Sequence, residues 1–142
     1  MVYRERVLVV DDASSLRELL SVLLEVEDDF EVVGTAADGA RALELADELE
    51  PDVVLLDLAM PGMDGMNALP ALRARLPWAR IVIFSAYDVD ALGAEARAAG
   101  ADDYVEKGAS VLSLVDRLRA LRPVDEHQRR GERPGRDGTM GA

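Results

Sequence analysis

The sequence has no cysteine, and Lys107 is the only lysine among its 16 lysine and arginine residues. Without cysteine, the chain can form no disulfide framework and can do no thiolate chemistry. It also lacks an apolar run of the roughly 20 residues that a membrane-spanning helix needs. The first residues, MVYRERVLVVDD, contain no small-residue cleavage site of the kind that ends a secretory signal peptide. From these absences we predict a cytoplasmic protein without membrane association.

The balance of charge is strongly acidic, with a net charge of −12 over 142 residues. Residues 123–142 add nothing to it, because they contain four acidic residues and four arginines. The whole excess therefore lies in residues 1–122. A body this acidic repels phosphate backbones, so we predict no direct binding to nucleic acid.

Short apolar runs alternate with helical patterns along the chain. The runs at 7–10, 53–56 and 81–84 are continuous and rich in β-branched residues, which is typical of parallel strands buried on both faces. Weaker strand patterns occupy 30–36 and 102–105. Between and after the strands lie helical patterns over 14–27, 38–50, 64–76, 88–100 and 110–121. This alternation predicts an α/β sheet with right-handed crossovers.

Local signals predict where some elements begin and end. Ser15 and Glu18 have the spacing of a capping box at the start of the first helix. Gly100 is placed to end the fourth helix. After Leu121 the apolar pattern disappears and proline, glycine and charge dominate. We therefore predict one domain over residues 1–122 and a disordered polar tail over 123–142, with no output domain.

Polar side chains follow four of the predicted strands, and they are Asp11, Asp12, Asp57, Ser85 and Lys107. In an open parallel sheet the carboxyl ends of the strands share one edge, where ligands bind. Two carboxylates 4 Å apart repel by about 4 kcal/mol at an effective dielectric near 20. Mg²⁺ or the ammonium of Lys107 could offset that repulsion. Each residue alone has an ordinary explanation as a helix cap, a turn residue or a surface charge, but their joint placement favours a site.

Four segments, VLVVDD, VVLLDLAMPGMDGM, IVIFSA and GADDYVEKGA, occur in this order with fitting separations. With them, residues 5–121 resemble the receiver domain of bacterial two-component response regulators. The resemblance implies a flavodoxin-like three-layer sandwich, in which five parallel strands in the order 2-1-3-4-5 are covered by five helices. It also implies a phosphoprotein in a phosphorelay that depends on magnesium.

The resemblance assigns roles to the residues around Asp57. That residue would accept a phosphoryl group from a phosphohistidine donor, since a carboxylate is a competent nucleophile toward phosphorus. Asp12, Asp57 and the main-chain carbonyl of Ala59 would bind Mg²⁺ directly, and Asp11 would help through a water molecule. Lys107 would pair with the phosphoryl group once it is attached.

Ser85 and Tyr104 match the switch pair of the family. Ser85 would move toward the new dianion, and Tyr104 would then rotate from an exposed to a more buried position. The face made by the fourth helix, the fifth strand and the fifth helix would change shape and signal to a protein target. A phosphorylation-dependent homodimer through the same face is a further expectation.

The implied partners are a sensor histidine kinase or a histidine phosphotransfer protein, facing the first helix and the loop after the fifth strand. The only histidine, His127, lies in the polar tail, so we do not expect the chain to be its own histidine donor. We expect no enzyme beyond the chain's assistance to its own phosphotransfer and autodephosphorylation. The alternatives are an interaction module that works without phosphorylation and a Mg²⁺-dependent phosphohydrolase. The complete set of polar residues argues against the first, and the lack of a second general acid-base argues against the second.

Three positions bear on how the loops and the acyl phosphate behave. Gly108 follows Lys107 where the family often has proline, so we expect a more mobile loop there. Ala59 and Tyr87 lie two residues after Asp57 and Ser85 respectively. Alanine has no acid or amide to guide a water molecule, and tyrosine can shield the site. These residues predict a long-lived acyl phosphate.

Overall fold

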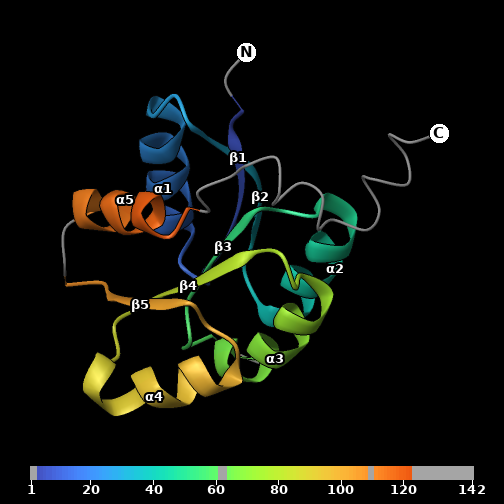
Figure 1. The fold of residues 1–142 in the computed structure, drawn as a ribbon, viewed down its shortest axis with the longest axis vertical. Helices are drawn as coiled ribbons and strands as arrows, with labels where there is room; N and C mark the ends of the chain where they lie inside the picture. Colours follow the sequence, from blue (N-terminus) through green and yellow to red (C-terminus); the bar gives the residue numbers. More distant parts are fainter. Residues whose placement is uncertain (1–2, 61–63, 109–110, 123–142) are drawn as a thin grey trace.

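The computed structural model describes residues 3–60, 64–108 and 111–122 (Figure 1). Strands and helices alternate along these residues in the order β1 (Glu5–Val10), α1 (Ser14–Val26), β2 (Phe30–Ala36), α2 (Gly39–Leu49), β3 (Val53–Leu56), α3 (Gly65–Arg75), β4 (Arg80–Ser85), α4 (Val89–Ala99), β5 (Asp103–Glu106) and α5 (Val111–Ala120). Within the described ranges, no helix has the length and hydrophobicity to cross a membrane. The boundary predicted at residue 122 and the tail predicted over 123–142 fall outside what the structure can test.

The five strands form one parallel sheet in the order β2-β1-β3-β4-β5. Figure 1 shows α1 and α5 together on one side of the sheet, and α2, α3 and α4 on the other. The predicted flavodoxin-like sandwich is therefore confirmed. Each strand is connected to the next strand of the chain through a helix, and these crossovers bury both faces of the sheet.

Two apolar layers, one on each face of the sheet, make up the core. Val7 and Val9 of β1 pack into the layer beneath α1 and α5, whereas Leu8 and Val10 pack into the layer beneath α2, α3 and α4. Alternate side chains of a strand point to opposite faces, so a strand covered on both sides needs an apolar residue at every position. This requirement explains why the strand runs in the sequence are continuous.

The predicted capping box of the first helix is wrong. Helix α1 begins at Ser14, its N-cap residue is Ala13, and no side chain caps it. Ser15 therefore lies inside the first turn, where it cannot act as the cap. The main-chain N–H of Ala13 instead donates to Oδ1 of Asp11, at 2.9 Å. Other helices do have side-chain caps, and the capping residues are Asp38, Asp64 and Asp88.

Gly100 ends α4 as predicted. Its φ of 124° lies in the region that favours glycine, and a Cβ there would be 2.8 Å from Cβ of Arg73. Nη1 of Arg73 donates to the carbonyl of Gly100 and to Oδ2 of Asp102, each at 3.1 Å. The C-terminal end of α4 is thus fixed against α3 and the start of β5.

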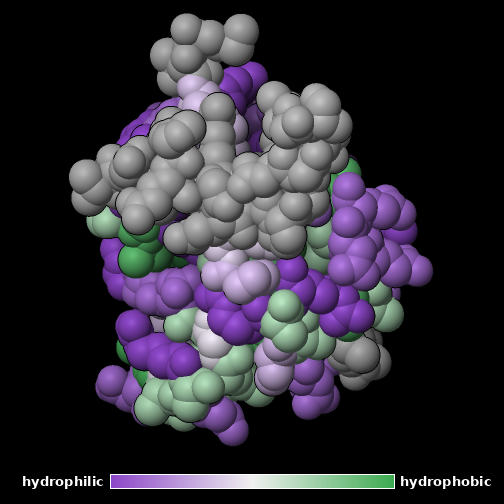
Figure 2. Space-filling model, turned by 45° about the vertical axis from the view of Figure 1, so that its right-hand side comes forward, coloured by the Kyte–Doolittle hydropathy of each residue, from purple (hydrophilic) through white to green (hydrophobic). Residues whose placement is uncertain are grey.

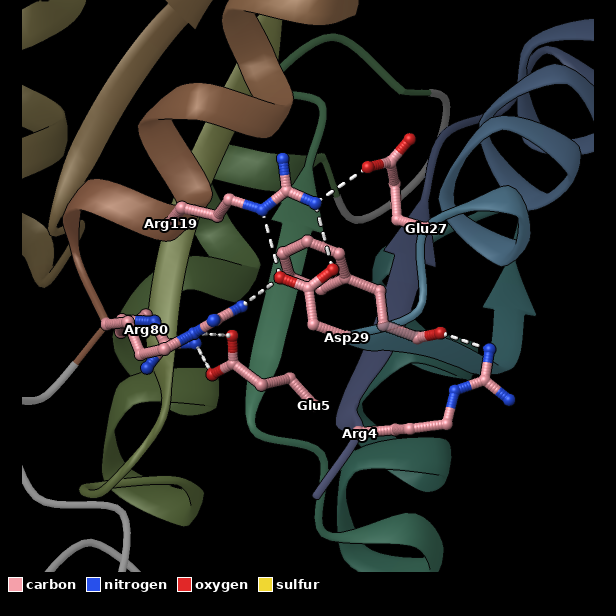
Figure 3. A network of polar contacts seen from close by, with 8 residues as sticks. Arg4, Glu5, Glu27, Asp29, Arg80 and Arg119 are labelled. Atoms are coloured by element: carbon pink, nitrogen blue, oxygen red, sulfur yellow. Dashed lines mark hydrogen bonds and ion pairs between the residues drawn. The ribbon is translucent and has the colours of Figure 1, made fainter. Parts of the chain in front are cut away.

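An ionic network occupies the amino ends of the strands (Figure 3). Glu5, which is fully buried, pairs with Arg80 at the start of β4 and with Nε of Arg122 at 2.8 Å. Buried charges are costly unless they are paired, and here the carboxylate of Glu5 has two guanidinium partners. The network joins β1, β4 and the residues that follow α5.

Asp29 anchors the end of α5 in the same network. Its carboxylate accepts hydrogen bonds from Nε of Arg119 at 2.9 Å and from Nη2 of Arg122 at 2.8 Å. Both guanidinium groups also lie over the ring of Phe30, at 5.7 and 5.4 Å from its centroid. The hydrogen bond from Arg119 is the largest cause that holds the pKa of Asp29 well below its usual value. Asp29 therefore stays ionised over the ordinary pH range.

Hydrophobic side chains reach the surface of the described residues in a few places. On the face drawn in Figure 2, the coloured hydrophobic areas are small and separated by hydrophilic residues. The large hydrophobic side chains that are exposed include a stripe on α1 formed by Leu19, Val22 and Val26. These residues follow a spacing of three and four, so they lie along one side of the helix.

Candidate functional site

The polar residues predicted at the strand ends do meet at one edge of the sheet. Asp11 directly follows β1 and Asp57 directly follows β3, while Ser85 ends β4 and Lys107 follows β5. Strands β1 and β3 are neighbours, and the strand order reverses between them. Asp11 and Asp57 therefore stand at the switch point of the sheet, where open α/β folds bind their ligands.

Three carboxylates form an oxygen cluster at this edge. Asp11, Asp12 and Asp57 each provide one oxygen, and these oxygens all lie within 4.8 Å of one another. Oxygens bound to one octahedral Mg²⁺ are at most about 4.2 Å apart, given Mg–O bonds of about 2.1 Å. Asp11 and Asp57 are buried, whereas Asp12 is exposed. The carboxylate donors suit a hard divalent cation that keeps several waters, and the oxygens would draw slightly closer together to bind one.

Lys107 lies between the two buried carboxylates. Its Nζ is 2.6 Å from Oδ2 of Asp11 and 3.4 Å from Oδ2 of Asp57. Burial alone would lower the pKa of Lys107, but its hydrogen bonds and charge interactions with both carboxylates together outweigh burial, and the pKa is raised. The ammonium is therefore protonated and offsets part of the repulsion within the cluster.

The environment of Asp57 raises the pKa of its carboxyl group. Burial is the largest cause that raises its pKa, and the nearby charge of Asp11 adds to the effect. The N–H of Ala59, 3.2 Å from Oδ1 of Asp57, and the ammonium of Lys107 act in the opposite direction without cancelling the rise. A bound cation would stabilise the ionised form of this buried carboxylate. The carbonyl of Ala59 as a further ligand stays a prediction.

Gly65 approaches the main chain of Asp57 more closely than any other residue type could. A Cβ at position 65 would lie 1.9 Å from the carbonyl oxygen of Asp57 and 2.7 Å from Cα of Leu58. The N–H of Gly65 donates to the carbonyl of Leu58 at 3.2 Å. Gly65 thus lets α3 begin directly against the residue that carries the buried carboxylate.

The predicted switch pair is connected through Tyr87. Ser85 is fully buried, and its Oγ accepts a hydrogen bond from the N–H of Tyr87 at 3.2 Å. The hydroxyl of Tyr104 donates to the carbonyl of Tyr87 at 2.9 Å. Burial is the main cause that raises the pKa of the Tyr104 hydroxyl. Ser85 and Tyr104 thus both hold the segment between β4 and α4.

Tyr104 is in its buried position in this structure. Only 3% of the residue is exposed, because the ring packs into the apolar layer beneath α2, α3 and α4. The exposed position from which we expected it to rotate is therefore not the one observed. The physical reason is that the ring gains apolar burial while its hydroxyl keeps a hydrogen-bond acceptor.

A groove of about 730 Å³ lies beside α3 and α4, next to the segments that follow Asp57 and Ser85. It is lined mainly by apolar side chains, with acidic ones at its edge, and includes Leu58, Met60, Met66, Leu92, Asp64 and Glu95. The ring of Tyr87, which is 49% exposed, also lines it. The residue proposed to shield the site therefore lies between the groove and Ser85.

Glu106 is a residue whose role the sequence did not reveal. It is the last residue of β5, beside Lys107, and its Oε2 accepts a hydrogen bond from the N–H of Val89 at 2.7 Å. Val89 is the first residue of α4. No sequence pattern connects these two residues, because the contact depends on where α4 begins relative to the end of β5.

The fold and the site together define a class of protein. The molecule is a doubly wound α/β protein with an acidic, cation-compatible cluster and one lysine at its switch point. The family model for the response regulator receiver domain matches residues 7–119. The chain therefore belongs to the response regulator receiver family of two-component signalling.

Similar proteins agree with this assignment. A protein-glutamate methylesterase/protein-glutamine glutaminase from Nocardioides sp. is 43% identical over 124 residues, which are 82% of this chain and 32% of that protein. The nitrate/nitrite response regulator protein NarL of Escherichia coli is 41% identical over 115 residues, which are 81% of this chain and 52% of NarL. The chain thus spans about a third to a half of the length of these relatives.

Solved structures show the same fold. The response regulator domain of Thermotoga maritima CheB superposes with a TM-score of 0.77 at 34% identity, covering 88% of this chain and 99% of that domain. The likeness thus extends over nearly the whole of that domain. It confirms the predicted family and the predicted order of strands.

Proposed function

We propose that this receiver domain accepts a phosphoryl group on Asp57 from a phosphohistidine donor. One observation carries the proposal: Asp57 is a buried carboxylate at the switch point, with the ammonium of Lys107 and a second buried carboxylate, that of Asp11, beside it. An oxygen of ionised Asp57 attacks phosphorus, the P–N bond to the donor imidazole breaks, and its electron pair leaves with the imidazole. The product is an acyl phosphate on Asp57.

Asp12, Asp57 and the main-chain carbonyl of Ala59 are proposed to hold Mg²⁺ directly, and Asp11 is proposed to help through a water molecule. When bound, the cation supplies positive charge that offsets the carboxylates and the phosphoryl oxygens. Lys107 then has a task of its own. Because its ammonium already lies 3.4 Å from Oδ2 of Asp57, a short movement of the side chain lets it pair with a phosphoryl oxygen.

Output is proposed to pass through Ser85 and Tyr104 to the face formed by α4, β5 and α5. The support is that both side chains hold the main chain of Tyr87, at the start of the connection to α4. A dianion on Asp57 would compete for the hydroxyl of Ser85 and so disturb this arrangement. A downstream protein, or a second copy of the chain, is proposed to recognise the altered face.

The phosphodonor is proposed to be a sensor histidine kinase or a histidine phosphotransfer protein that docks on α1. The exposed stripe of Leu19, Val22 and Val26 supports this docking, since it offers apolar area to a partner helix. A cytoplasmic location, no direct contact with nucleic acid, and the domain limits of 1–122 with a disordered tail stay predictions.

The chain's own role is proposed to be signalling, with no activity beyond its own phosphotransfer and dephosphorylation. The name methylesterase belongs to longer relatives, of which this chain covers about a third. The competing function is signalling without phosphorylation. In that case, signalling would continue when the carboxylates of the oxygen cluster are removed. The hydrolase alternative would require turnover of an outside substrate.

One experiment tests the proposal directly. The protein is incubated with acetyl phosphate, with and without Mg²⁺, and its intact mass is measured. We expect a phosphate adduct that requires Mg²⁺, is absent in Asp57→Asn, and persists in the control Asp38→Asn, which changes an exposed helix cap on α2. An unmodified wild-type protein under all conditions would favour the phosphorylation-independent module, and steady release of phosphate from an outside ester would favour the hydrolase.

A further inference from the structure

The N-terminal end of α4 is held by two different elements. The N–H of Asp90 donates to Oδ1 of Asp88 at 2.9 Å, and the N–H groups of Ala91 and Leu92 donate to the carbonyl of Asp88. These contacts lie within the helix and its own cap. The N–H of Val89 instead donates to Oε2 of Glu106, at 2.7 Å. A donor with no partner in its own helix is thus satisfied by a carboxylate from β5.

The position of Glu106 connects this contact to the candidate site. Glu106 is in register with Ser85 across the β4–β5 ladder. The next residue, Lys107, donates its main-chain N–H to the carbonyl of Ser85 at 2.7 Å. The backbone that presents Glu106 is therefore the backbone that carries Lys107, and it is bonded directly to Ser85.

Tyr104 provides a second attachment on the same side of β5. It precedes Glu106 by two residues, so both side chains point to the face of the sheet that α4 covers. Its hydroxyl holds the carbonyl of Tyr87, and Glu106 holds the N–H of Val89. The segment that leads into α4 is thus fixed to β5 at both of its ends.

Electrostatics favour the contact at Glu106. A carboxylate near the N-terminus of a helix interacts favourably with the helix dipole and with the unpaired N–H groups there. The opposite end of α4 is fixed separately, where Gly100 packs against Arg73. Loss of the Glu106 contact would therefore loosen the first turn of α4 and leave the opposite end of the helix in place.

We propose that Glu106 is a positioning residue that holds the first turn of α4 against β5 and transmits changes at Ser85 and Lys107 to that helix. The coupling rests on the proposed phosphorylation of Asp57. The existence of the contact between Glu106 and Val89 does not rest on that proposal, because the structure shows the contact directly. Glu106 is assigned no contact with the phosphoryl group, so phosphorylation should still occur without it.

The first test needs no phosphate. Amide hydrogen exchange of the full chain is measured by NMR for the wild type, Glu106→Ala and Glu106→Gln. We expect Val89 to exchange about tenfold faster in Glu106→Ala, since tenfold corresponds to about 1.4 kcal/mol and a hydrogen bond to a charged group has about that value. Glu106→Gln keeps an acceptor oxygen and should show a smaller increase. Asn67, whose N–H is capped by Asp64 on α3, should be unchanged.

A rate for Val89 in Glu106→Ala equal to that of the wild type would overturn the proposal. So would an equal increase at Asn67, because that result would indicate general loosening of the fold. Neither result depends on whether Asp57 is a phosphoacceptor.

The second test adds acetyl phosphate and Mg²⁺ and compares Glu106→Ala with Asp88→Ala, which removes a cap within α4 but no link to β5. We expect phosphorylation to alter the exchange of residues 89–92 in the wild type and in Asp88→Ala. In Glu106→Ala the mass adduct should still form, yet the change in exchange should fall by more than about half. If the change in exchange fell equally in Glu106→Ala and Asp88→Ala, Glu106 would act only as a cap of α4, and the proposed coupling would be refuted. No adduct in the wild type would refute the proposed function and leave the contact to the first test.

Discussion

At the scale of single residues, the chain uses arginine wherever it needs a general positive charge and lysine only beside Asp57. The arginines form forked contacts, such as the two hydrogen bonds from Arg119 to Asp29. Lys107 instead places one compact ammonium between two carboxylates. A planar guanidinium is larger and has fixed donor directions, so it cannot take the same position without displacing one of the carboxylates.

This difference predicts the effect of Lys107→Arg. We expect phosphorylation by acetyl phosphate to slow about tenfold, the equivalent of about 1.4 kcal/mol in transition-state stabilisation. The initial rate of adduct formation, followed by intact mass, is the measurement. Arg75→Lys, which changes an exposed ion pair with Asp47, is the matched control and should keep the wild-type rate. Equal rates for Lys107→Arg and the wild type would remove the special role of lysine.

A second prediction concerns the charge on Asp57. Its pKa is raised in the folded protein, chiefly by burial, so the ionised form is less favourable in the folded than in the unfolded chain. At neutral pH the charge therefore lowers the free energy of unfolding. We expect Asp57→Asn to be more stable than the wild type at pH 7, while Lys107 keeps its partner Asp11.

The same reasoning fixes the pH dependence of that difference. Below the unfolded pKa of 3.8, Asp57 is protonated in both states and its penalty disappears. The gap between Asp57→Asn and the wild type should therefore narrow as pH falls toward that value. Urea unfolding at pH 7 and at lower pH measures it. A gap that is absent at pH 7, or constant with pH, would contradict the prediction.

At the scale of elements, the sequence predicted what depends on burial and missed what depends on contacts between elements. The runs at 53–56 and 81–84 became β3 and β4 because strands covered on both faces must be apolar throughout. The capping box failed because Asp11 binds the N–H of Ala13 and α1 starts one residue before Ser15. Glu106 had no visible role because its partner Val89 is distant in sequence.

In the candidate site, too, some features could be predicted from the sequence and others depend on contacts between elements. Asp11, Asp57 and Lys107 could be predicted, because parallel strands bring their carboxyl ends to one edge whatever the details of packing. The buried position of Tyr104 could not, since a ring at a strand end can lie on either side of its Cβ. The close approach of Gly65 to Asp57 likewise depends on the path between β3 and α3.

We predict that Gly65→Ala destabilises the fold and that Gly108→Ala does not. The new methyl group at 65 would overlap the carbonyl of Asp57, whereas a Cβ at 108 meets nothing within 4 Å. Overpacking of this kind costs about 1–3 kcal/mol. We expect Gly65→Ala to lower the free energy of unfolding by that amount and to slow phosphorylation of Asp57, and urea unfolding with intact-mass kinetics measures both. Equal behaviour of the two variants would show that the close approach is unimportant.

At the scale of the whole molecule, the functional cluster and the ionic network lie at opposite ends of one sheet. Asp11, Asp57 and Lys107 follow the carboxyl ends of strands, while Glu5, Phe30 and Arg80 begin strands at the amino ends. Figure 3 shows Arg119 reaching both Asp29 and Glu27 at that second end. At the carboxyl ends of the strands, repulsion among the carboxylates destabilises the fold until a cation binds. At the amino ends, the ion pairs of the ionic network stabilise it.

This arrangement predicts how global stability responds to acid. The pKa of Asp29 is lowered in the folded state, mainly by Arg119, so its ion pairs stabilise the fold above the unfolded value of 3.8 and are lost as pH falls below it. We expect Asp29→Asn to cost about 2 kcal/mol at pH 7, because hydrogen bonds between charged groups are lost. The deficit should shrink in acid.

Asp28→Asn is the matched control, because Asp28 is the exposed neighbour of Asp29. Urea unfolding of both variants at pH 7 and near pH 2, well below the unfolded pKa of Asp29, is the measurement. A full deficit that persists below the unfolded pKa would contradict the ionic origin, and a similar loss in Asp28→Asn would show that local charge alone is responsible.

The network around Arg122 has a practical consequence for experiments on this protein. Arg122 is bonded to Glu5 and Asp29 at the amino ends of the strands, so the backbone at the end of the described domain has a fixed location away from Asp57. A fluorescent label or surface tether attached directly after residue 122 would therefore leave the oxygen cluster, at the opposite end of the strands, accessible to a phosphodonor. In a variant that lacks Asp29, Arg122 loses one of its two ion pairs, so a label attached after it should rotate more freely. The mobility of the label would therefore report whether the ionic network is intact.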